Sequence, residues 1–304
     1  MRDFKIDFNK SFIKVLIVYI AIFVVGVVFA CIWGVNLDIN FSGGTKISYS
    51  YTGEVKDDDL KAVIDKNLDA KYDFSKSTSL AGDTKTFEIS LVGKDALSAE
   101  KQEKLTKALT DGFKDNKIAL YNSNSVSPTM AGTFFVKSLV AVILTAIFVI
   151  IYVGIRFRKI GGISAALTAL VALVIDVLIT FFTCVIFRLQ IDSNFIAVVL
   201  TMLGYSLNDT IVVYDRVREN KRLSPEMEIG NVVNLSINQT LIRNIVTSVT
   251  TILAVMTIVV VSEMFGLQSL RTFAIPMAFG LVSGSISSLC IAGPLWVKWK
   301  RRKA

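Results

Sequence analysis

The segment Met202–Asn220, MLGYSLNDTIVVYDRVREN, places a carboxylate inside a run of residues suited to a lipid bilayer. Asn208 and Asp209 stand side by side, and the apolar residues 211–214 follow them. An aspartate side chain is too short to reach the membrane surface as a lysine can. A charge at the centre of a membrane helix costs about 2.5–3.5 kcal/mol, so Asp209 needs a partner or a function.

The rest of the chain shares the apolar character of this segment. It has 304 residues, of which 53% are hydrophobic, and the apolar residues gather in long runs. A helix of about 20 residues crosses a hydrocarbon core about 30 Å thick. Six runs qualify: Val15–Trp33, Phe134–Ile155, Ile163–Phe187, Asn194–Tyr214, Ile245–Val261 and Phe273–Trp296. They predict a polytopic α-helical membrane protein with six transmembrane helices. The first run is too long for a signal peptide and lacks a cleavage site, so it is expected to remain as an anchor.

Basic residues mark one side of the predicted bundle. They are Arg2, Lys5, Lys10 and Lys14 before the first run, Arg156, Arg158 and Lys159 after the second, Arg216, Arg218, Lys221 and Arg222 after the fourth, and Lys298, Lys300, Arg301, Arg302 and Lys303 after the sixth. The short loops on the other side carry only Arg188 and Arg271. The positive-inside rule therefore predicts that both termini are cytoplasmic. This asymmetry explains most of the net charge of +8, so no nucleic-acid partner is needed.

One hydrophilic insert, residues 36–132, lies between the first two runs on the predicted outer side. Alternating apolar residues predict strands at 45–51, 84–92 and 117–122, with a weaker strand at 72–77. Apolar residues at helical spacing predict helices at 57–68 and 98–113, the second capped by Ser98. The order β-α-β-β-α-β predicts an external α+β domain of the ferredoxin-like kind. The chain thus divides into residues 1–35 with the first helix, this domain at 36–132, and helices two to six with cytoplasmic loops and a basic C-terminus at 133–304.

Glycines form a second group of interest. Gly43 and Gly44 are expected to form a tight turn into the first strand; a phosphate-binding loop would need a helix after them. Gly280 and Gly284 lie among serines in the last run, and Gly204 lies in the fourth. Small residues at such spacing allow helices to approach closely in lipid. A moving contact with a partner helix is the alternative interpretation of this stretch.

Enzymatic chemistry has little support in the sequence. The chain has no histidine, which is the most common general base and metal ligand. No Gly-x-Ser-x-Gly, Walker A or Cys-x-x-Cys pattern occurs. We therefore expect no catalytic residue, no metal site and no cofactor.

Two further charges fall within apolar runs. Asp176 lies near the middle of the third run, and Arg243 lies at the start of the fifth at a depth comparable to that of Asp209. Asp209 and Arg243 can form a fixed ion pair that joins two helices. Alternatively, the pair breaks and reforms as Asp209 gains and loses a proton. The nearby polar residues Asn208, Thr210 and Asn244 favour the second interpretation, because a simple clamp would not need them.

The chain resembles the SecF family of bacterial protein-export subunits, which belongs to the RND transporter superfamily. The resemblance rests on GYSLNDTIVVYDRVREN at 204–220 and SINQTLIRNIVTSVTT at 236–251, and it continues in FSGGT, DVLIT and FGLVSGSISSLCIAGPL. It covers nearly the whole chain in order and spacing.

This resemblance implies a six-helix half-transporter in the bacterial cytoplasmic membrane that pairs with SecD. The complex would promote preprotein movement through SecYEG with the proton gradient, or a sodium gradient, as its energy source. The family's intramembrane acid and arginine fall on Asp209 and Arg243, and Asn208 and Asp176 complete the candidate relay. Two positions depart from the family pattern: Ile175 replaces the usual histidine before Asp176, and Asn40 replaces an acid. The rival hypotheses are an independent exporter of small molecules or lipids and a structural assembly factor for the translocon.

Overall fold

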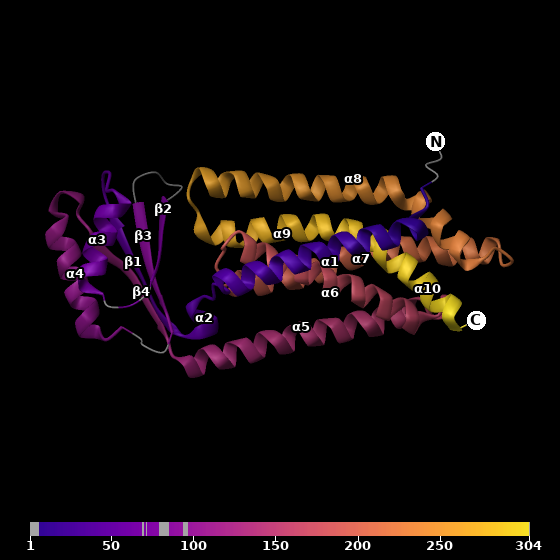
Figure 1. Ribbon diagram of the computed structural model, residues 1–304, viewed down its shortest axis with the longest axis horizontal. Helices are drawn as coiled ribbons and strands as arrows, with labels where there is room; N and C mark the ends of the chain where they lie inside the picture. The colour runs from indigo at the N-terminus through magenta and orange to yellow at the C-terminus, as the bar shows by residue number, and fades with distance from the viewer. Residues whose placement is uncertain (1–5, 69, 71, 79–84, 94–96, 304) are drawn as a thin grey trace.

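The computed structural model describes residues 6–68, 70, 72–78, 85–93 and 97–303. Arg2 and Lys5, two of the predicted topological charges, lie outside these residues, as do Thr84 of a predicted strand and the side chain of Lys303. The described chain forms a bundle of long helices with a smaller α+β unit at one end (Figure 1).

Within the described residues, six helical segments are long and apolar enough to cross a membrane. They are α1 (Phe8–Trp33), α5 (Pro128–Arg156), α6 (Gly162–Ile186), α7 (Ser193–Leu223), α8 (Ile229–Met264) and the run Gln268–Arg302, in which α9 (Gln268–Ser287) leads through η3 (Ser288–Ala292) into α10 (Gly293–Lys303). This confirms the predicted polytopic helical membrane protein. The α6 and α9 helices lie inside the bundle, whereas α5 and α8 lie on opposite flanks (Figure 1).

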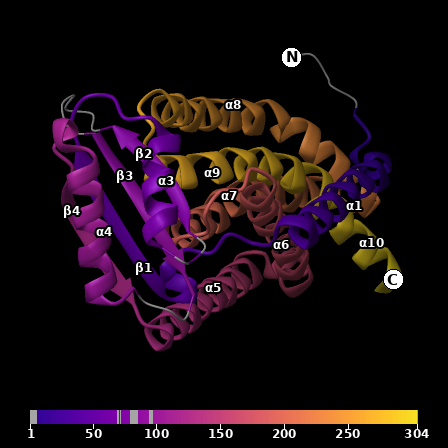
Figure 2. The ribbon, with the colours of Figure 1, turned by 60° about the vertical axis from the view of Figure 1, so that its left-hand side comes forward.

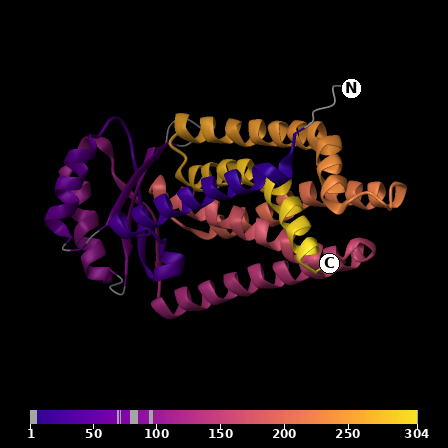
Figure 3. The ribbon, with the colours of Figure 1, turned by 45° about the vertical axis from the view of Figure 1, so that its right-hand side comes forward.

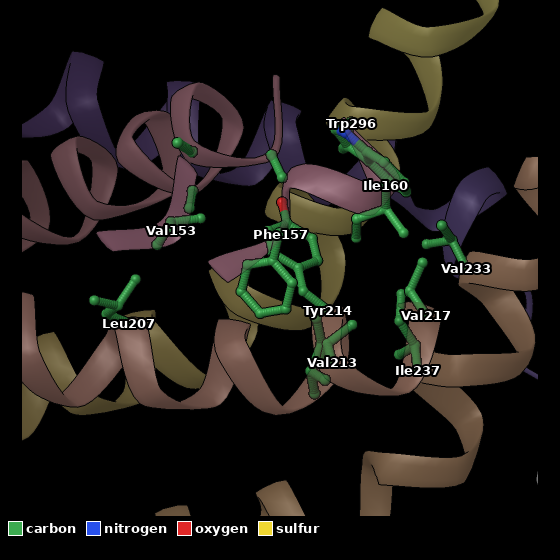
Figure 4. Packing of buried hydrophobic residues seen from close by; sticks show 14 of the residues in the cluster. Val153, Phe157, Ile160, Leu207, Val213, Tyr214, Val217, Val233, Ile237 and Trp296 are labelled. Carbon is green, nitrogen blue, oxygen red and sulfur yellow. The ribbon is translucent and has the colours of Figure 1, made fainter. Parts of the chain in front are cut away.

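Helix boundaries differ from the prediction at several places, and α1 and α5 begin before their apolar runs. The α7 and α8 helices extend well beyond their apolar runs, so the expected loop between Arg216 and Arg243 shrinks to residues 224–228. The extensions are stable because Val217 and Val233 are fully buried in a cluster with Tyr214, Phe157 and Trp296 (Figure 4). The last run is also not a single α-helix, because η3 is a π-helical turn.

The α+β unit contains β1 (Gly44–Tyr51), α3 (Asp57–Asn67), β2 (Asp73–Thr78), β3 (Lys85–Val92), α4 (Ala99–Gly112) and β4 (Ala119–Val126), with η1 (Lys114–Asn116) before the last strand. The four antiparallel strands have the order β2-β3-β1-β4. Tyr49 pairs with Phe87 across β1 and β3, and their rings stack at 5.2 Å. The α3 and α4 helices cover the sheet face that is turned away from the bundle (Figures 1 and 2). Leu60, Ile64 and Leu105 form the core between these layers and are fully buried.

The α+β unit joins the bundle through α2 (Ile39–Ser42) and two glycines. Gly43 ends α2 with φ 79°, and Gly44 enters β1 with φ 137°. A Cβ atom on Gly44 would lie 2.0 Å from the Leu91 carbonyl oxygen. Both positions therefore require glycine, for the turn and for the close approach of two backbones.

Two carboxylates lie at this joint. Leu37 and Ile191 form a parallel bridge, which brings the following residues, Asp38 and Asp192, beside each other. Asp192 caps α7 by accepting from the Asn194 N–H at 2.9 Å, and it also accepts from the Thr272 hydroxyl at 3.0 Å. Burial raises the pKa of the Asp192 carboxyl, and the Asp38 charge raises it further.

Candidate functional site

Asp176 lies in the middle of α6 and is enclosed by hydroxyl groups. Its side chain is 1% exposed. Ser206 of α7 donates to Oδ2 at 2.7 Å, Ser287 of α9 donates to Oδ2 at 2.9 Å, and Ser283 of α9 donates to Oδ1 at 2.6 Å. Three short hydrogen bonds from neutral donors can stabilise a buried carboxylate without a cation. We call Asp176 and these three serines the Asp176 cage.

A tyrosine and a glycine complete the surroundings of the Asp176 cage. The Tyr19 hydroxyl of α1 is 3.0 Å from the Ser283 carbonyl oxygen, to which it donates, and 3.2 Å from Ser283 Oγ. A Cβ atom on Gly284 would lie 3.1 Å from Ser206 Cβ and 3.6 Å from Asp176 Oδ2. Gly284 therefore lets α9 come close enough to α7 for the serines to reach the acid. The cage thus ties together α1, α6, α7 and α9.

Asp209 on α7 has fewer partners than Asp176. It is 2% exposed, and Ser248 of α8 donates to its Oδ2 at 3.4 Å. Among the described residues, no ion pair joins Asp209 to Arg243, so the predicted fixed clamp is absent from this structure. The Arg243 side chain is exposed, whereas Asp209 is buried. Asn244, the next residue, is buried, and its Nδ2 has no hydrogen-bond partner in the described structure.

Polar groups of α7 and η3 lie between the two acids, although no hydrogen bond of the described structure joins Asp209 itself to them. The Ser288 hydroxyl donates to the Ser206 carbonyl oxygen at 3.2 Å. The Thr210 hydroxyl, next to Asp209 in sequence, donates to Ser288 Oγ at 3.2 Å. Ser288 is also the first residue of the π-helical turn η3. Such turns occur often at functional sites because they reposition side chains within a helix.

An uncovered face of α7 lies beside Asp209. Thr201, Gly204, Asn208, Ile211 and Asp215 follow one another at spacings of three and four residues and are exposed or half-buried. We call this face the α7 stripe. A Cβ atom on Gly204 would meet no atom within 4 Å, so the stripe is open at this point. The exposed Arg243 of α8 is a neighbouring charge that lipid tails would not solvate.

A cavity of about 1450 Å³ lies next to the α7 stripe, between the end of α5, α7 and α8. Asn208, Thr240 and Arg243 contribute to its wall, together with seven further basic and two acidic side chains. It brings an open polar surface to the residues that flank Asp209. No three histidine, cysteine, aspartate or glutamate side chains gather as a metal site within the described residues.

Several residues of this site were not predicted from the sequence. The serines of the last run were interpreted as small residues for close packing, but Ser283 and Ser287 donate to Asp176. Ser206, Ser248 and Tyr19 also belong to the site, and nothing in the sequence pattern singles them out. The four-residue spacing of Ser283 and Ser287 was the available signal, because it places both hydroxyls on one helix face. Of the predicted relay, the structure places Asn208, Asp209 and Arg243 near the cavity, and it places Asp176 in a separate, closed environment.

These features define a class: a polytopic helical membrane protein with two buried acids, a polar cavity and an uncovered helix face. The family model described as protein export membrane protein SecD/SecF, C-terminal, matches residues 104–302. The chain therefore belongs to the SecD/SecF family, as its sequence motifs indicate.

Individual relatives show how much of each protein the chain matches. The protein translocase subunit SecF of Petrotoga mobilis is 34% identical over 98% of this chain and 97% of its own length. SecF of Borreliella burgdorferi is 32% identical over 95% of this chain and 96% of its own length. SecDF of Bacillus subtilis is 33% identical over 98% of this chain, which spans only 39% of that longer protein.

Solved structures of SecDF share the fold. SecDF from Thermus thermophilus, a translocon-associated membrane protein, has a TM-score of 0.80 and 27% identity over 99% of this chain and 39% of its own. SecDF in a super-membrane-facing form has a TM-score of 0.65 and 25% identity, and the match covers 100% of this chain and 40% of the SecDF chain.

Proposed function

We propose that this chain is an accessory subunit of the Sec translocase that works with SecD. The pair would use the proton gradient, or a sodium gradient, to promote preprotein translocation and release through SecYEG. The SecF and SecDF relatives support a role in protein translocation. The proposal assigns the chain no enzymatic reaction and no bound cofactor, because the gradient supplies the energy.

The observation that carries this proposal is the α7 stripe beside Asp209. Asn208 and Arg243 are polar and exposed on membrane helices, and Gly204 leaves room for a close neighbour. Arg243 also lines the open polar cavity, and polar or charged groups on a membrane helix are unfavourable against lipid, so a protein partner should cover the adjoining stripe. In B. subtilis the matched region is part of one longer SecDF chain. A SecD subunit packed on the α7 stripe would supply an equivalent arrangement, with Asp209 near the contact between the two halves.

Asp209 is the residue we assign to ion coupling. It has one hydroxyl donor among the described residues, and the polar cavity reaches its neighbour Asn208. The positive charge of Arg243 can shift toward or away from the acid as the helices move. Gain or loss of a proton, or of a sodium ion, would then change which arrangement of α7 and α8 is favoured.

We further propose the placement of the chain in the bacterial cytoplasmic membrane, with both termini in the cytoplasm and the α+β unit outside. The support is the concentration of basic side chains at the end of the bundle that lies away from that unit. We also assign the α+β unit to the ferredoxin-like class, because its element order and its strand order β2-β3-β1-β4 fit that class.

The test is Asp209→Asn, with Glu263→Gln as control on the adjacent helix α8. Glu263 pairs with Arg271 at 2.8 Å and lies outside the α7 stripe and the cavity, so it is a partnered acid away from the proposed site. Secretion into inverted membrane vesicles would be measured with and without an uncoupler, and again with and without sodium. We expect Asp209→Asn to insert and to co-purify with SecD but to lose gradient-dependent stimulation, whereas Glu263→Gln keeps it. Normal gradient-sensitive stimulation in Asp209→Asn would exclude the coupling role and favour an assembly factor.

A further inference from the structure

A groove of about 1030 Å³ lies on the outside of the bundle between the end of α5, the start of α6 and α10. We call it the α5–α10 groove. The α10 helix leaves the bundle axis after η3 and runs toward the turn between α5 and α6 (Figures 1 and 3). Ile150, Ile151 and Leu167 line its apolar part, and Arg158 and Lys300 line its basic end. It borders the cavity beside Asp209 at Ile155 and Arg158, which line both, and the cavity shares none of its other lining residues.

Glycines explain why this groove is open. A Cβ atom on Gly162 would lie 2.0 Å from the Gly154 carbonyl oxygen, so α5 and α6 touch through their backbones here. A Cβ atom on Gly154 would meet nothing within 4 Å, which leaves the adjacent space unfilled. Gly161 has φ 105°, and a Cβ atom there would lie 2.5 Å from Lys300 Nζ. The lysine amine therefore lies directly over the glycine turn.

The two cations of the groove lack an acidic partner, unlike the basic residues close to them in the sequence. Arg156 pairs with Asp215, and Arg301 pairs with Glu228. In the described structure, Arg158 and Lys300 form no ion pair, and the wall of the groove contains no carboxylate. Lys300 instead lies 5.8 Å from the centre of the Trp296 ring. The groove thus presents two positive charges that no acid of the described chain neutralises.

We propose that the α5–α10 groove binds one anionic phospholipid, with its phosphate between Arg158 and Lys300 and one acyl chain along Ile150, Ile151 and Leu167. The charge pattern selects this occupant. An acyl chain satisfies the apolar wall, which a soluble phosphate would leave uncovered, and a zwitterionic headgroup would bring its own cation to Arg158 and Lys300. Basic pockets between membrane helices commonly bind anionic headgroups.

The test is native mass spectrometry of the full chain with added phosphatidylglycerol or phosphatidylcholine. Arg158→Gln with Lys300→Gln removes the two unpaired charges. Arg156→Gln with Arg301→Gln removes the same net charge at the same end of the bundle. At about 1 kcal/mol per cation, we expect the first pair to weaken phosphatidylglycerol binding about 30-fold. The second pair should leave it within about threefold.

Gly154→Leu provides an independent variant, because it fills the apolar part and leaves both charges in place. It should lower phosphatidylglycerol binding, and excess inorganic phosphate should not displace the lipid from the unmodified chain. The proposal is overturned if both double variants lose binding equally, which would indicate a diffuse charge effect. It is also overturned if phosphatidylcholine binds as well as phosphatidylglycerol, if free phosphate displaces the lipid, or if Gly154→Leu changes nothing.

Discussion

Replacing Ser283 with alanine should destabilise the bundle by about 1–2 kcal/mol. The substitution removes the 2.6 Å hydrogen bond to Asp176 Oδ1 and a 3.2 Å contact with the Tyr19 hydroxyl. A hydrogen bond to a charged group contributes about 1.5–3 kcal/mol in soluble proteins. Measured values inside membranes average about 0.6 and reach about 1.7 kcal/mol, because unfolded helices in the bilayer also find partners. Asp176 is 1% exposed and retains only two side-chain donors after the substitution, so the upper part of the membrane range applies.

The assay is the unfolding free energy of the full chain in bicelles, measured by steric trapping. Ser285→Ala is the matched control, because the Ser285 hydroxyl bonds to the Leu281 carbonyl oxygen of its own helix at 2.8 Å. The same two substitutions are then made in an Asp176→Asn background. A neutral amide accepts a weaker hydrogen bond than a carboxylate. The cost of Ser283→Ala should therefore fall by at least half in that background, whereas the cost of Ser285→Ala should not change.

Two results would refute this reasoning. Ser283→Ala could lower the unfolding free energy by the same amount as Ser285→Ala, within about 0.3 kcal/mol. Alternatively, its effect on the unfolding free energy could be the same with and without the Asp176→Asn substitution. In either case the hydroxyl groups would not be what stabilises Asp176 in the membrane.

Four further predictions follow from the structure. Gly284→Ala should cost about 1–3 kcal/mol because its Cβ would press on Ser206, whereas Gly204→Ala should cost nothing; thermal unfolding of the two variants in detergent compares them. The raised pKa of Asp192 means that the folded chain holds this proton more tightly than the unfolded chain, so stability should fall as pH rises through the folded pKa. Asp192→Asn should flatten that dependence in melting curves recorded across pH, and an unchanged slope would contradict the assignment. Residues 36–127 expressed alone should unfold cooperatively, with Leu105→Ala costing about 2–5 kcal/mol in a denaturant titration. A cysteine introduced at Asp58 should react with a membrane-impermeant maleimide in intact cells, and labelling only after permeabilisation would reverse the proposed topology.

The sequence was sufficient for the parts of the fold that depend on local pattern. The six apolar runs correspond to six long helical segments in the described part of the chain, because lipid imposes hydrophobicity over a fixed length. Helix ends were harder to place. Beyond the apolar run of α7, Val217 and Asn220 are covered by protein rather than by lipid, so surrounding residues can be charged without ending the helix. The hydropathy criterion detects lipid contact, not helical structure.

The candidate site shows a second limit of sequence reasoning. Position along a helix gives depth in the membrane, and on that basis Arg243 lay level with Asp209. It does not give the direction of a side chain, which turns by about 100° per residue. In α8 this difference places Asn244 inside and Arg243 outside, so the acid and the arginine do not pair here. Likewise, the serines of α9 contact Asp176 only because the packing of α6 against α9 turns their face toward it.

The two membrane acids differ in whether their surroundings come from this chain alone or also from a partner. Asp176 has three short hydrogen bonds from α7 and α9, so its own chain fully determines its environment. Asp209 has one hydroxyl donor at 3.4 Å and lies beside the uncovered α7 stripe, so its environment depends on whatever packs there. A partially satisfied buried acid responds to a change in its neighbours more than a fully satisfied one does. Thr210, the residue after Asp209, bonds to Ser288 of the π-helical turn η3, so a shift of this part of α7 would act on the turn that follows α9. We therefore expect Asp209 to be the acid that changes state during the cycle, and the Asp176 cage to be the fixed connection that carries the resulting motion of α7 to α9.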